Sequence, residues 1–344
     1  MDISQFDYIL PPEFIAQHPL PERDASRMMV VLRKEERILH SRFSEFPSYF
    51  CKGDVLVLNN TKVIPAKVWG KKNGTEVEFL FIKEREKGVW EVLCRPAKKI
   101  KAGDRLRFAP DFEATVIEGG EEGRRVLEFS DVDILGHLQK IGFAPLPPYI
   151  KRKKANGDTR PNDLERYQTV FAEKEGAIAA PTAGLHFTPQ ILDLIQDKGV
   201  RIEQVSLHVG LATFQPMRVE HIEEHKMLEE TYAINEHAAE AINRAKLESR
   251  PVVAVGTTVV RTLESAYRTI GGVRPGASST SLFIYPGFNF QVVDKLLTNF
   301  HLPKSTLLML VAAFAGHDLI MRAYKEAVRE NYRFFSYGDC MLIV

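Results

Sequence analysis

The sequence predicts an α/β domain with a mainly parallel sheet, into which a small all-β barrel is inserted. After about residue 155, apolar strands alternate with amphipathic helices, and between residues 66 and 129 there are six short alternating segments. Strands that alternate with helices are typical of a parallel sheet with helices on its faces. Short strands at close spacing, separated by turn residues, are typical of a small barrel. At 344 residues the chain is long enough for two domains.

One apolar strand, residues 54–58, precedes the barrel and has the composition of a strand buried on both faces. It belongs with the α/β part, so that domain is predicted to be discontinuous, over 1–62 and 156–344, around a barrel domain over 63–155. The predicted barrel strands are 66–70, 76–82, 89–95, 105–109, 113–118 and 125–129. In the α/β domain we expect helices at 189–198, 235–248, 259–270 and 307–315, and strands at 178–180, 202–205, 252–255, 282–285 and 339–344.

The composition predicts a cytoplasmic protein without a membrane partner. A net charge of +1 provides no global field for nucleic acid or membrane. The three cysteines are widely spaced and form no C-x-x-C pair, which argues against a disulfide framework and a zinc knuckle. The N-terminal residues lack the basic and then apolar run of a signal peptide, and the apolar run 307–315 is too short to span a bilayer. With no coiled-coil seam, we expect a monomer.

Two segments place a histidine near a glycine among apolar residues: APTAGLHFT (180–188) and LHVG (207–210). A buried imidazole titrates near neutrality and can give or take a proton. We therefore predict that His186 and His208 form the acid–base pair of one polar site, with neither assigned as the acid or the base. The alternative for each is a satisfied core histidine.

A strand, a tight turn and a helix are predicted over residues 250–264. Gly256 permits the turn, Thr257 or Thr258 can cap the helix, and the free N–H groups there favour a carboxylate or a phosphate. Arg261 could hold a carboxylate or pair with Glu264 on the surface. The segment has neither nucleotide-binding glycine pattern, and an ordinary turn remains the alternative.

Asn299 and His301 are predicted to lie in a loop before the apolar helix 307–315, which Ser305 can cap. Capping does not explain these two polar side chains, and beside an apolar helix they could line a cleft.

The predicted barrel is locally basic. Residues 67–154 contain 19 Lys and Arg against 14 Asp and Glu, a net charge of +5. The charge is concentrated at 95–101 and 151–154, which suits contact with a phosphate backbone, although solvated lysines would look the same. The candidate residues for this contact are Lys98, Lys99, Lys101, Lys151, Arg152, Lys153 and Lys154.

His221 and His225 match the H-x-x-E-H spacing in which two helical histidines bind zinc. A zinc site needs a third protein ligand, and nothing in the sequence nominates one. A metal-dependent hydrolase therefore stays an alternative, and we predict no metal site.

Together these segments resemble the S-adenosylmethionine:tRNA ribosyltransferase-isomerase family of queuosine biosynthesis, over nearly the whole chain. Three positions depart from the family pattern: Leu211 in place of alanine, Ala212 in place of glycine and Leu228 in place of histidine. The segments that carry the resemblance are 10–28, 56–66, 145–152, 166–172, 180–188, 207–216, 223–227, 253–265, 298–316 and 332–343.

The resemblance implies a transferase and isomerase of tRNA modification. The ribosyl part of S-adenosylmethionine would move onto 7-aminomethyl-7-deazaguanine at the wobble position of tRNA, giving epoxyqueuosine, adenine and methionine. S-adenosylmethionine is then a substrate, and no cofactor is expected. A non-catalytic RNA-binding protein is the other alternative. The candidate substrate-binding residues are Thr182, Gly184, Phe187, Thr213, Gly256, Thr257, Thr258, Arg261, Asn299 and His301, with Arg27, Asn60 and Asp339 on weaker grounds.

Overall fold

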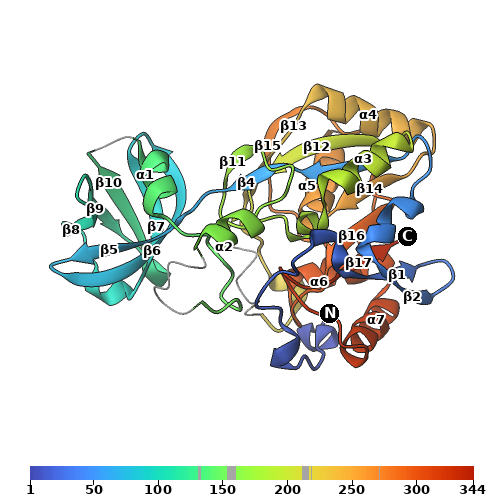
Figure 1. Cartoon of the computed structure of the whole chain (residues 1–344), viewed down its shortest axis with the longest axis horizontal. Helices are drawn as coiled ribbons and strands as arrows, with labels where there is room; N and C mark the ends of the chain where they lie inside the picture. Colours follow the sequence, from blue (N-terminus) through green and yellow to red (C-terminus); the bar gives the residue numbers. More distant parts are fainter. Residues whose placement is uncertain (131–132, 153–159, 211–216, 218, 271) are drawn as a thin grey trace.

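A computed structural model describes residues 1–130, 133–152, 160–210, 217, 219–270 and 272–344. It contains a nine-stranded sheet with helices on both faces and a closed six-stranded barrel beside it (Figure 1). The predicted fold class, an α/β domain with an inserted small barrel, is confirmed.

The barrel contains all six predicted strands, and one of them, β6, is longer than expected. Its order is β10-β7-β6-β5-β8-β9, and every pairing is antiparallel. Phe79, Phe81 and Phe112 fill the interior, and Leu138 of helix α1 (Ile134–Ile141) packs against them. The strands are β5 (Lys67–Lys72), β6 (Thr75–Glu86), β7 (Val89–Arg95), β8 (Arg105–Ala109), β9 (Phe112–Gly119) and β10 (Arg124–Phe129).

The chain enters and leaves the barrel at one place. Lys67, the first residue of β5, and Phe143, just after α1, exchange two backbone hydrogen bonds of 3.2 and 2.8 Å. Closer to the large sheet, β4 (Thr61–Val63) pairs in parallel with β11 (Lys174–Ala177). The domain limits at 63 and 155 stay a prediction.

The large sheet is mixed. Its central strands are parallel, in the order β12-β3-β14-β16, and β17 and β1 form a further parallel pair. The remaining pairings are antiparallel, at both edges and between β16 and β17. The strands are β1 (Arg27–Leu32), β2 (Arg37–Arg42), β3 (Val55–Asn59), β12 (Arg201–Leu207), β13 (Glu230–Ile234), β14 (Val252–Val255), β15 (Gly276–Thr280), β16 (Lys295–Asn299) and β17 (Cys340–Ile343).

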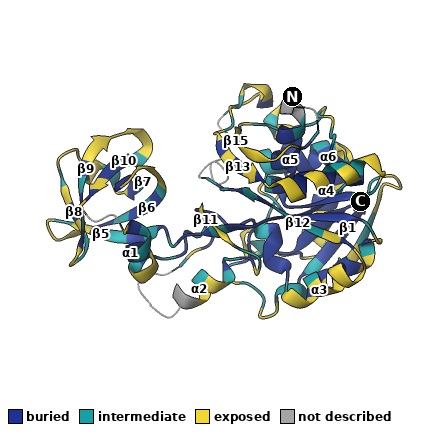
Figure 2. Cartoon of the chain, turned by 90° about the horizontal axis from the view of Figure 1, so that it is seen from above, coloured by how far each residue is buried: buried dark blue, intermediate teal, exposed yellow. Residues whose placement is uncertain are grey.

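Two apolar cores cover the two faces of this sheet, whose central strands are buried (Figure 2). On one face, Val55 and Val57 of β3 pack with helices α4 (Glu236–Leu247), α5 (Thr257–Ile270), α6 (Thr306–Ala315) and α7 (His317–Arg329). On the other, Leu56 and Leu58 pack with α3 (Pro189–Asp197) and the 3₁₀ turns η4 (Phe43–Tyr49) and η8 (Thr182–His186). Alternation along one strand thus supplies both cores.

Some predicted elements differ from the structure. Residues 178–180 and 282–285 are apolar and lie in no strand, and Gly276–Thr280 forms the edge strand instead. Ile178 is buried against the barrel core, although it lies in no strand. A buried segment is apolar whether or not it forms a strand, so its composition alone does not predict one. The sequence analysis also missed β1, β2, β4, β11, β13, β16, α1, α2 (Arg160–Arg166) and α7, and Asn299 ends β16 rather than lying in a loop.

Among the described residues, no single helix has both the length and the apolar composition to cross a membrane. Helices α6 and α7 pass that test only as a pair, bent by 118°.

Glu264 of helix α5 fixes the backbone that leads into strand β16. Its carboxylate is fully buried and accepts the N–H groups of Gln291, Val292 and Val293 at 2.9 to 3.0 Å, just before β16. Glu264→Ala leaves three donors unsatisfied, so we expect a loss of about 3 kcal/mol or more in the free energy of unfolding. Urea titration measures this loss, with the exposed Glu240→Ala as control. Equal stability of the two variants would contradict this account.

Candidate functional site

The carboxyl ends of the central strands open onto one cleft. Val209 follows β12, Gly256 follows β14, and Thr298 and Asn299 end β16; all four line it. This hollow, called the cleft below, has a volume of ≈ 80 Å³, or ≈ 720 Å³ with the open solvent at its mouth. Ligands of open α/β sheets bind outside the carboxyl ends of the strands. Six of the predicted substrate-binding residues line the cleft: Thr182, Gly256, Thr257, Thr258, Asn299 and His301.

Two helices begin at the cleft. Gly256 has φ 89°, a left-handed conformation that favours glycine and turns the chain from β14 into α5. Thr257 and Thr258 then form the first turn of α5, where backbone N–H groups lack an intrahelical partner. Helix α6 begins beside them, with Ser305 as its N-cap accepting from Leu308 N–H at 3.2 Å. Both helix N-termini favour a negatively charged group in the cleft.

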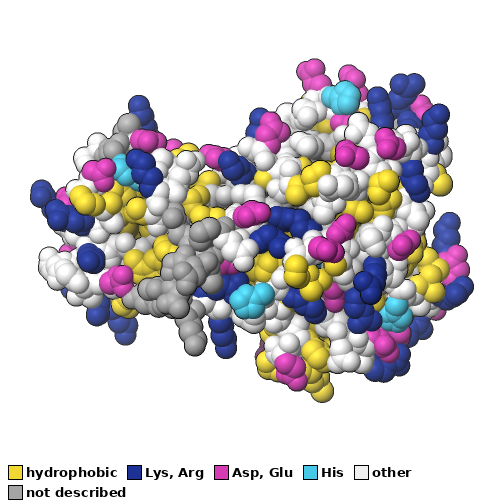
Figure 3. Space-filling view, in the orientation of Figure 1, with side chains coloured by type: hydrophobic (Ala, Val, Ile, Leu, Met, Phe, Trp, Pro, Cys, Tyr) yellow, Lys and Arg dark blue, Asp and Glu magenta, His cyan; other side chains and the backbone are white. Residues whose placement is uncertain are grey.

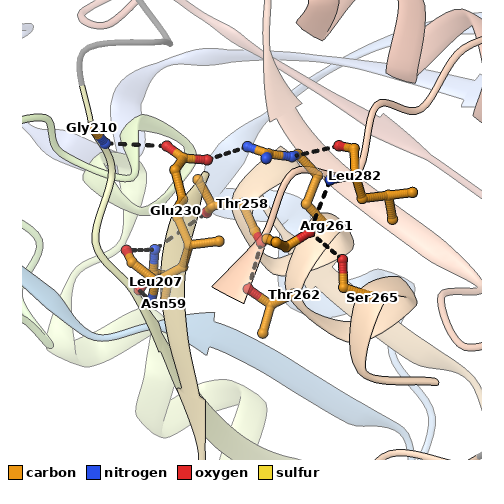
Figure 4. Close-up of polar contacts among 10 residues, drawn as sticks. Asn59, Leu207, Gly210, Glu230, Thr258, Arg261, Thr262, Ser265 and Leu282 are labelled. Atoms are coloured by element: carbon orange, nitrogen blue, oxygen red, sulfur yellow. Dashed lines mark hydrogen bonds and ion pairs between the residues drawn. The ribbon is translucent and has the colours of Figure 1, made fainter. Parts of the chain in front are cut away.

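Asn59, which the sequence analysis did not select, connects the strand ends behind the cleft (Figure 4). Its Nδ2 donates to the carbonyl of Leu207 at 3.0 Å and to the hydroxyl of Thr258 at 3.3 Å. Its Oδ1 accepts the N–H groups of Leu207 and Thr61 at 3.0 and 3.2 Å. The side chain therefore joins the end of β12, the start of α5 and β4. Its only sequence signal is a polar residue at the end of an apolar strand.

Arg261 does not line the cleft. Its guanidinium is buried and pairs with the carboxylate of Glu230, and its Nε donates to the carbonyl of Leu282 at 3.1 Å (Figure 4). The second oxygen of Glu230 accepts the N–H of Gly210 at 3.1 Å. The alternative pairing of Arg261 with Glu264 is wrong, because Glu264 binds the backbone before β16. Arg261 instead fixes the chain that follows His208.

His186 ends the 3₁₀ turn η8 and is 4% exposed. Its Nδ1 shares a hydrogen bond of 2.7 Å with the Ser26 hydroxyl, while its Nε2 is buried without a partner. Burial lowers the pKa of His186 to about 4, although Asn299 raises it in part. Asn299 Oδ1 is also buried without a partner. At neutral pH His186 is a neutral imidazole between the cleft and a second hollow, which it lines.

His208 lies apart from His186. It follows β12, its Nδ1 shares a hydrogen bond of 2.9 Å with the Thr61 hydroxyl, and its ring lies over Gly176 of β11. Burial lowers its pKa. Of the predicted acid–base pair, His186 lines the second hollow and His208 lines neither hollow, so the structure does not bring the two together in one cavity. Their roles stay a prediction.

His301, which follows β16, lines the cleft directly. Its Nε2 shares a hydrogen bond of 2.8 Å with the Thr298 hydroxyl, and its backbone N–H donates to Tyr324. Desolvation of the partly buried ring lowers the pKa of His301 to about 3. The side chain is therefore a neutral hydrogen-bonding group at pH 7.

Five predicted substrate-binding residues lie elsewhere in the structure. Gly184 and Phe187 serve packing: a Cβ on Gly184 would come within 2.7 Å of another side chain, and Phe187 is in the sheet core. Asn60 bonds to side chains of β12 and its surroundings. Arg27 stacks over an aromatic ring at 3.8 Å, and Asp339 accepts two backbone N–H groups. Thr213, like Ala212, lies outside the described residues.

The basic residues predicted to contact a phosphate backbone, which the family resemblance makes candidates for tRNA binding, fall into two groups. Lys98, Lys99 and Lys101 are exposed on the barrel after β7, and Lys151 is exposed between the domains. Arg152 instead makes a bidentate ion pair with Asp163, at 2.8 Å for both bonds, so its charge is compensated. Lys153 and Lys154 lie outside the described residues.

The zinc motif lacks the helix it requires. Residues 222–224 form one 3₁₀ turn, and His225 packs against Phe283. In the described part of the chain, no three His, Cys, Asp or Glu side chains are grouped as a metal site would need.

The lowered pKa values of His186 and His301 predict that the protein loses stability in acid. Each has a pKa below the usual value near 6.5, so the folded state binds fewer protons than the unfolded state as the pH falls through 6.5 toward 4. Stability is therefore complete above pH 6.5 and falls below it, by about 2 kcal/mol per histidine at pH 5. Urea midpoints at pH 7 and pH 5 measure this, and His301→Gln should lose less on acidification than the parent protein. Parallel behaviour of the two proteins would refute the assignment.

The buried ion pair predicts a structural role for Arg261. Arg261→Met strands the carboxylate of Glu230 in the interior and should cost about 3–5 kcal/mol, measured by urea unfolding. The double variant Glu230→Leu with Arg261→Met removes both charges and should recover most of that loss. If Arg261 served only a substrate, the single variant would keep its stability within about 0.5 kcal/mol.

Comparisons with known proteins identify the family of this chain. The chain matches the family described as Queuosine biosynthesis protein over residues 3–343. Relatives from Thermotoga maritima and Carboxydothermus hydrogenoformans, each 50% identical over 100% of both chains, carry the name S-adenosylmethionine:tRNA ribosyltransferase-isomerase. A crystal structure of S-adenosylmethionine tRNA ribosyltransferase from T. maritima covers 99% of this chain and 100% of its own, at 40% identity and a TM-score of 0.56. The chain belongs to the queuosine biosynthesis protein family.

Proposed function

We propose that this protein is an S-adenosylmethionine:tRNA ribosyltransferase-isomerase. It transfers and isomerises the ribosyl part of S-adenosylmethionine onto 7-aminomethyl-7-deazaguanine at the wobble position of tRNA, and the products are epoxyqueuosine-tRNA, adenine and methionine. Full-length identity of about 50% to proteins of that name carries the proposal. S-adenosylmethionine is a substrate here, no cofactor takes part, and the protein works as a cytoplasmic monomer.

The cleft is the proposed site for S-adenosylmethionine. The methionine carboxylate would lie at the N-terminus of α5, where Thr257 and Thr258 add hydroxyl groups to the free N–H groups. Arg261, a candidate for this contact in the sequence, is paired with Glu230 instead. Helix N-termini and hydroxyls therefore supply the anion contacts without a lysine or arginine among the described cleft residues.

The chemistry requires proton transfers and close positioning. A sulfonium acidifies the adjacent 5′ carbon, so a neutral imidazole can remove a proton there and start the isomerisation. His186 fits a base best, because its lowered pKa keeps it neutral and its Nε2 has no protein partner. Adenine must leave with a proton or a hydrogen bond, for which His301 and Asn299 are the groups in the cleft. The amine of the modified base has to be held neutral near the sugar.

The test is incubation with S-adenosylmethionine and tRNA that carries 7-aminomethyl-7-deazaguanine. Adenine release and nucleoside mass analysis should show adenine together with epoxyqueuosine. His186→Ala should lower the rate by about 10²–10⁴-fold, the usual contribution of a general acid or base. His221→Ala, at an exposed histidine of the zinc motif, is the matched control and should keep full activity.

Three outcomes separate the candidate functions. Adenine and epoxyqueuosine, with activity lost in His186→Ala alone, support the proposal. Neither product, from folded protein that still binds the tRNA, supports a non-catalytic RNA-binding protein. Activity lost in His221→Ala would support the metal-dependent alternative.

A further inference from the structure

A second hollow beside the cleft is lined by two arginines. It is lined by Arg23, Ser26, Arg166, His186, Ser336 and Tyr337, among other described residues. Its volume is ≈ 30 Å³, and ≈ 310 Å³ with the solvent that it opens to. We call it the arginine pocket.

Among the described residues, the two guanidinium groups of this pocket bind only backbone carbonyls. Arg23 donates to Leu185 and Glu165 at 3.1 Å each. Arg166 donates to Pro21 at 3.0 Å and to Leu20 at 2.7 Å. Within the described ranges of the chain, neither makes an ion pair with a carboxylate. A carbonyl carries no net charge, so both positive charges are left uncompensated in a partly buried place, which favours an anion.

Nearby acidic side chains do not remove this charge. Glu22 lines the pocket and Glu165 adjoins Arg23, but both side chains are exposed, and water screens their attraction. Arg152 lies next to the pocket with its own partner, Asp163. In the described part of the chain, Arg125 and Arg333 also bind only backbone carbonyls, so the arginine pocket is distinguished by two such guanidinium groups that line one hollow.

Three polar atoms at the pocket are buried without a hydrogen-bond partner: Tyr337 Oη, His186 Nε2 and Arg166 Nε. Tyr337 and His186 are each 4% exposed and line the pocket. Burial raises the pKa of Tyr337, so its hydroxyl keeps its proton and can donate. Unsatisfied buried groups are rare in proteins, and a ligand oxygen would satisfy the two donors among them, the Tyr337 hydroxyl and Arg166 Nε.

We propose that the arginine pocket is an oxyanion-binding subsite that Arg23, Arg166 and Tyr337 form for a substrate. This inference rests on the proposed function, which supplies two oxyanions: a phosphodiester of the tRNA and the carboxylate of S-adenosylmethionine. Planar guanidinium forks suit either anion. The opening to solvent and the uncompensated double charge favour the phosphodiester. In Figure 3, Lys and Arg side chains gather at the centre of the face, between the barrel and the large domain.

The position of the subsite suits a nucleotide whose base enters the cleft. Ser336 lines both hollows and shares a hydrogen bond of 2.7 Å with Tyr149, which lines the cleft. His186 on the pocket side and Asn299 on the cleft side lie between them. A phosphate held by Arg23 and Arg166 would therefore anchor the RNA backbone directly beside His186, the proposed general base. The two hollows would then divide the substrate between backbone and nucleoside.

The test compares Arg166→Gln and Tyr337→Phe with the parent protein. Tyr337→Phe removes a hydroxyl that has no protein partner, so this variant should fold normally. Arg244→Gln, at an exposed arginine of α4 paired with Glu248, is the matched control. Filter binding with the substrate tRNA at several salt concentrations should show about tenfold weaker binding for Arg166→Gln. The slope of log affinity against log salt should fall by roughly one for a lost phosphate contact.

A second arm identifies the source of the oxyanion. Equilibrium dialysis measures affinity for S-adenosylmethionine and for its decarboxylated analogue. If the Arg166→Gln and Tyr337→Phe variants bind tRNA more weakly than the parent protein and bind S-adenosylmethionine equally well, the subsite holds a phosphodiester. If S-adenosylmethionine binding weakens and the analogue is unaffected, the subsite holds the carboxylate.

Unchanged affinity for both substrates in the folded variants would overturn the subsite. Adenine release by the parent protein in the same preparation tests the proposed function separately. If the parent protein releases no adenine, the proposed function is contradicted, and the binding data still decide whether the arginine pocket holds an oxyanion.

Discussion

The cleft depends on the side chain of Asn59, which holds three segments in one place. Its amide makes four hydrogen bonds, two of them to the backbone of Leu207, one to Thr61 and one to Thr258. A carboxamide provides two donors and an acceptor oxygen with two lone pairs, so its capacity here is used in full. Because β3 is buried on both faces, these bonds form away from competing water and hold firmly. The end of β12 and the start of α5 are thereby set relative to each other.

The polar groups around the cleft and the arginine pocket are of two kinds. Arg152 with Asp163, and Asn59, have partners within the protein and hold the backbone; Arg261 does so through Glu230, with its Nη2 left without a partner. The unpartnered atoms of His186, Asn299 and Tyr337 lie at the two hollows, where a substrate can reach them. Rigid polar networks next to unsatisfied groups are what a preorganised site requires, because the donors need no rearrangement when a substrate arrives.

Burial also sets the protonation of the site. Both His186 and His301 are neutral at physiological pH, since the interior disfavours a charged imidazole. Neutral rings accept protons, which matches a reaction that starts with proton removal from a carbon beside a sulfonium. They also avoid repulsion of a substrate that itself carries a positive charge. The cleft thus combines neutral side chains with the partial positive charge of helix ends.

Periodicity and turn chemistry predicted those parts of the fold that are encoded locally. The barrel strands, the buried strand β3 and the turn at Gly256 were read from neighbouring residues, and the structure contains them. Six cleft residues were also predictable from the sequence, because a hydroxyl, amide or imidazole beside a glycine turn or a strand end marks the edge of an α/β sheet where ligands bind.

What the sequence could not supply depends on contacts between distant segments. Arg261 looked available because its partner, Glu230, lies 31 positions away. Arg23 gave no signal, since its partners are carbonyl groups, which every residue possesses. The strand β16 was missed for a related reason: its polar residues Thr298 and Asn299 resemble a loop until the neighbouring strands are placed.

The way in which the barrel joins the large domain has a consequence for folding. Lys62 and Glu175, on the paired strands β4 and β11, are 113 positions apart, so their meeting in an unfolded chain carries a substantial loop-closure entropy. Once the barrel has formed, Lys67 and Phe143 are already hydrogen-bonded neighbours, and most of that loop is closed. The folded barrel therefore shortens the loop that must close when β4 and β11 pair. A segment that interrupts the sequence of the larger domain therefore helps that domain to assemble.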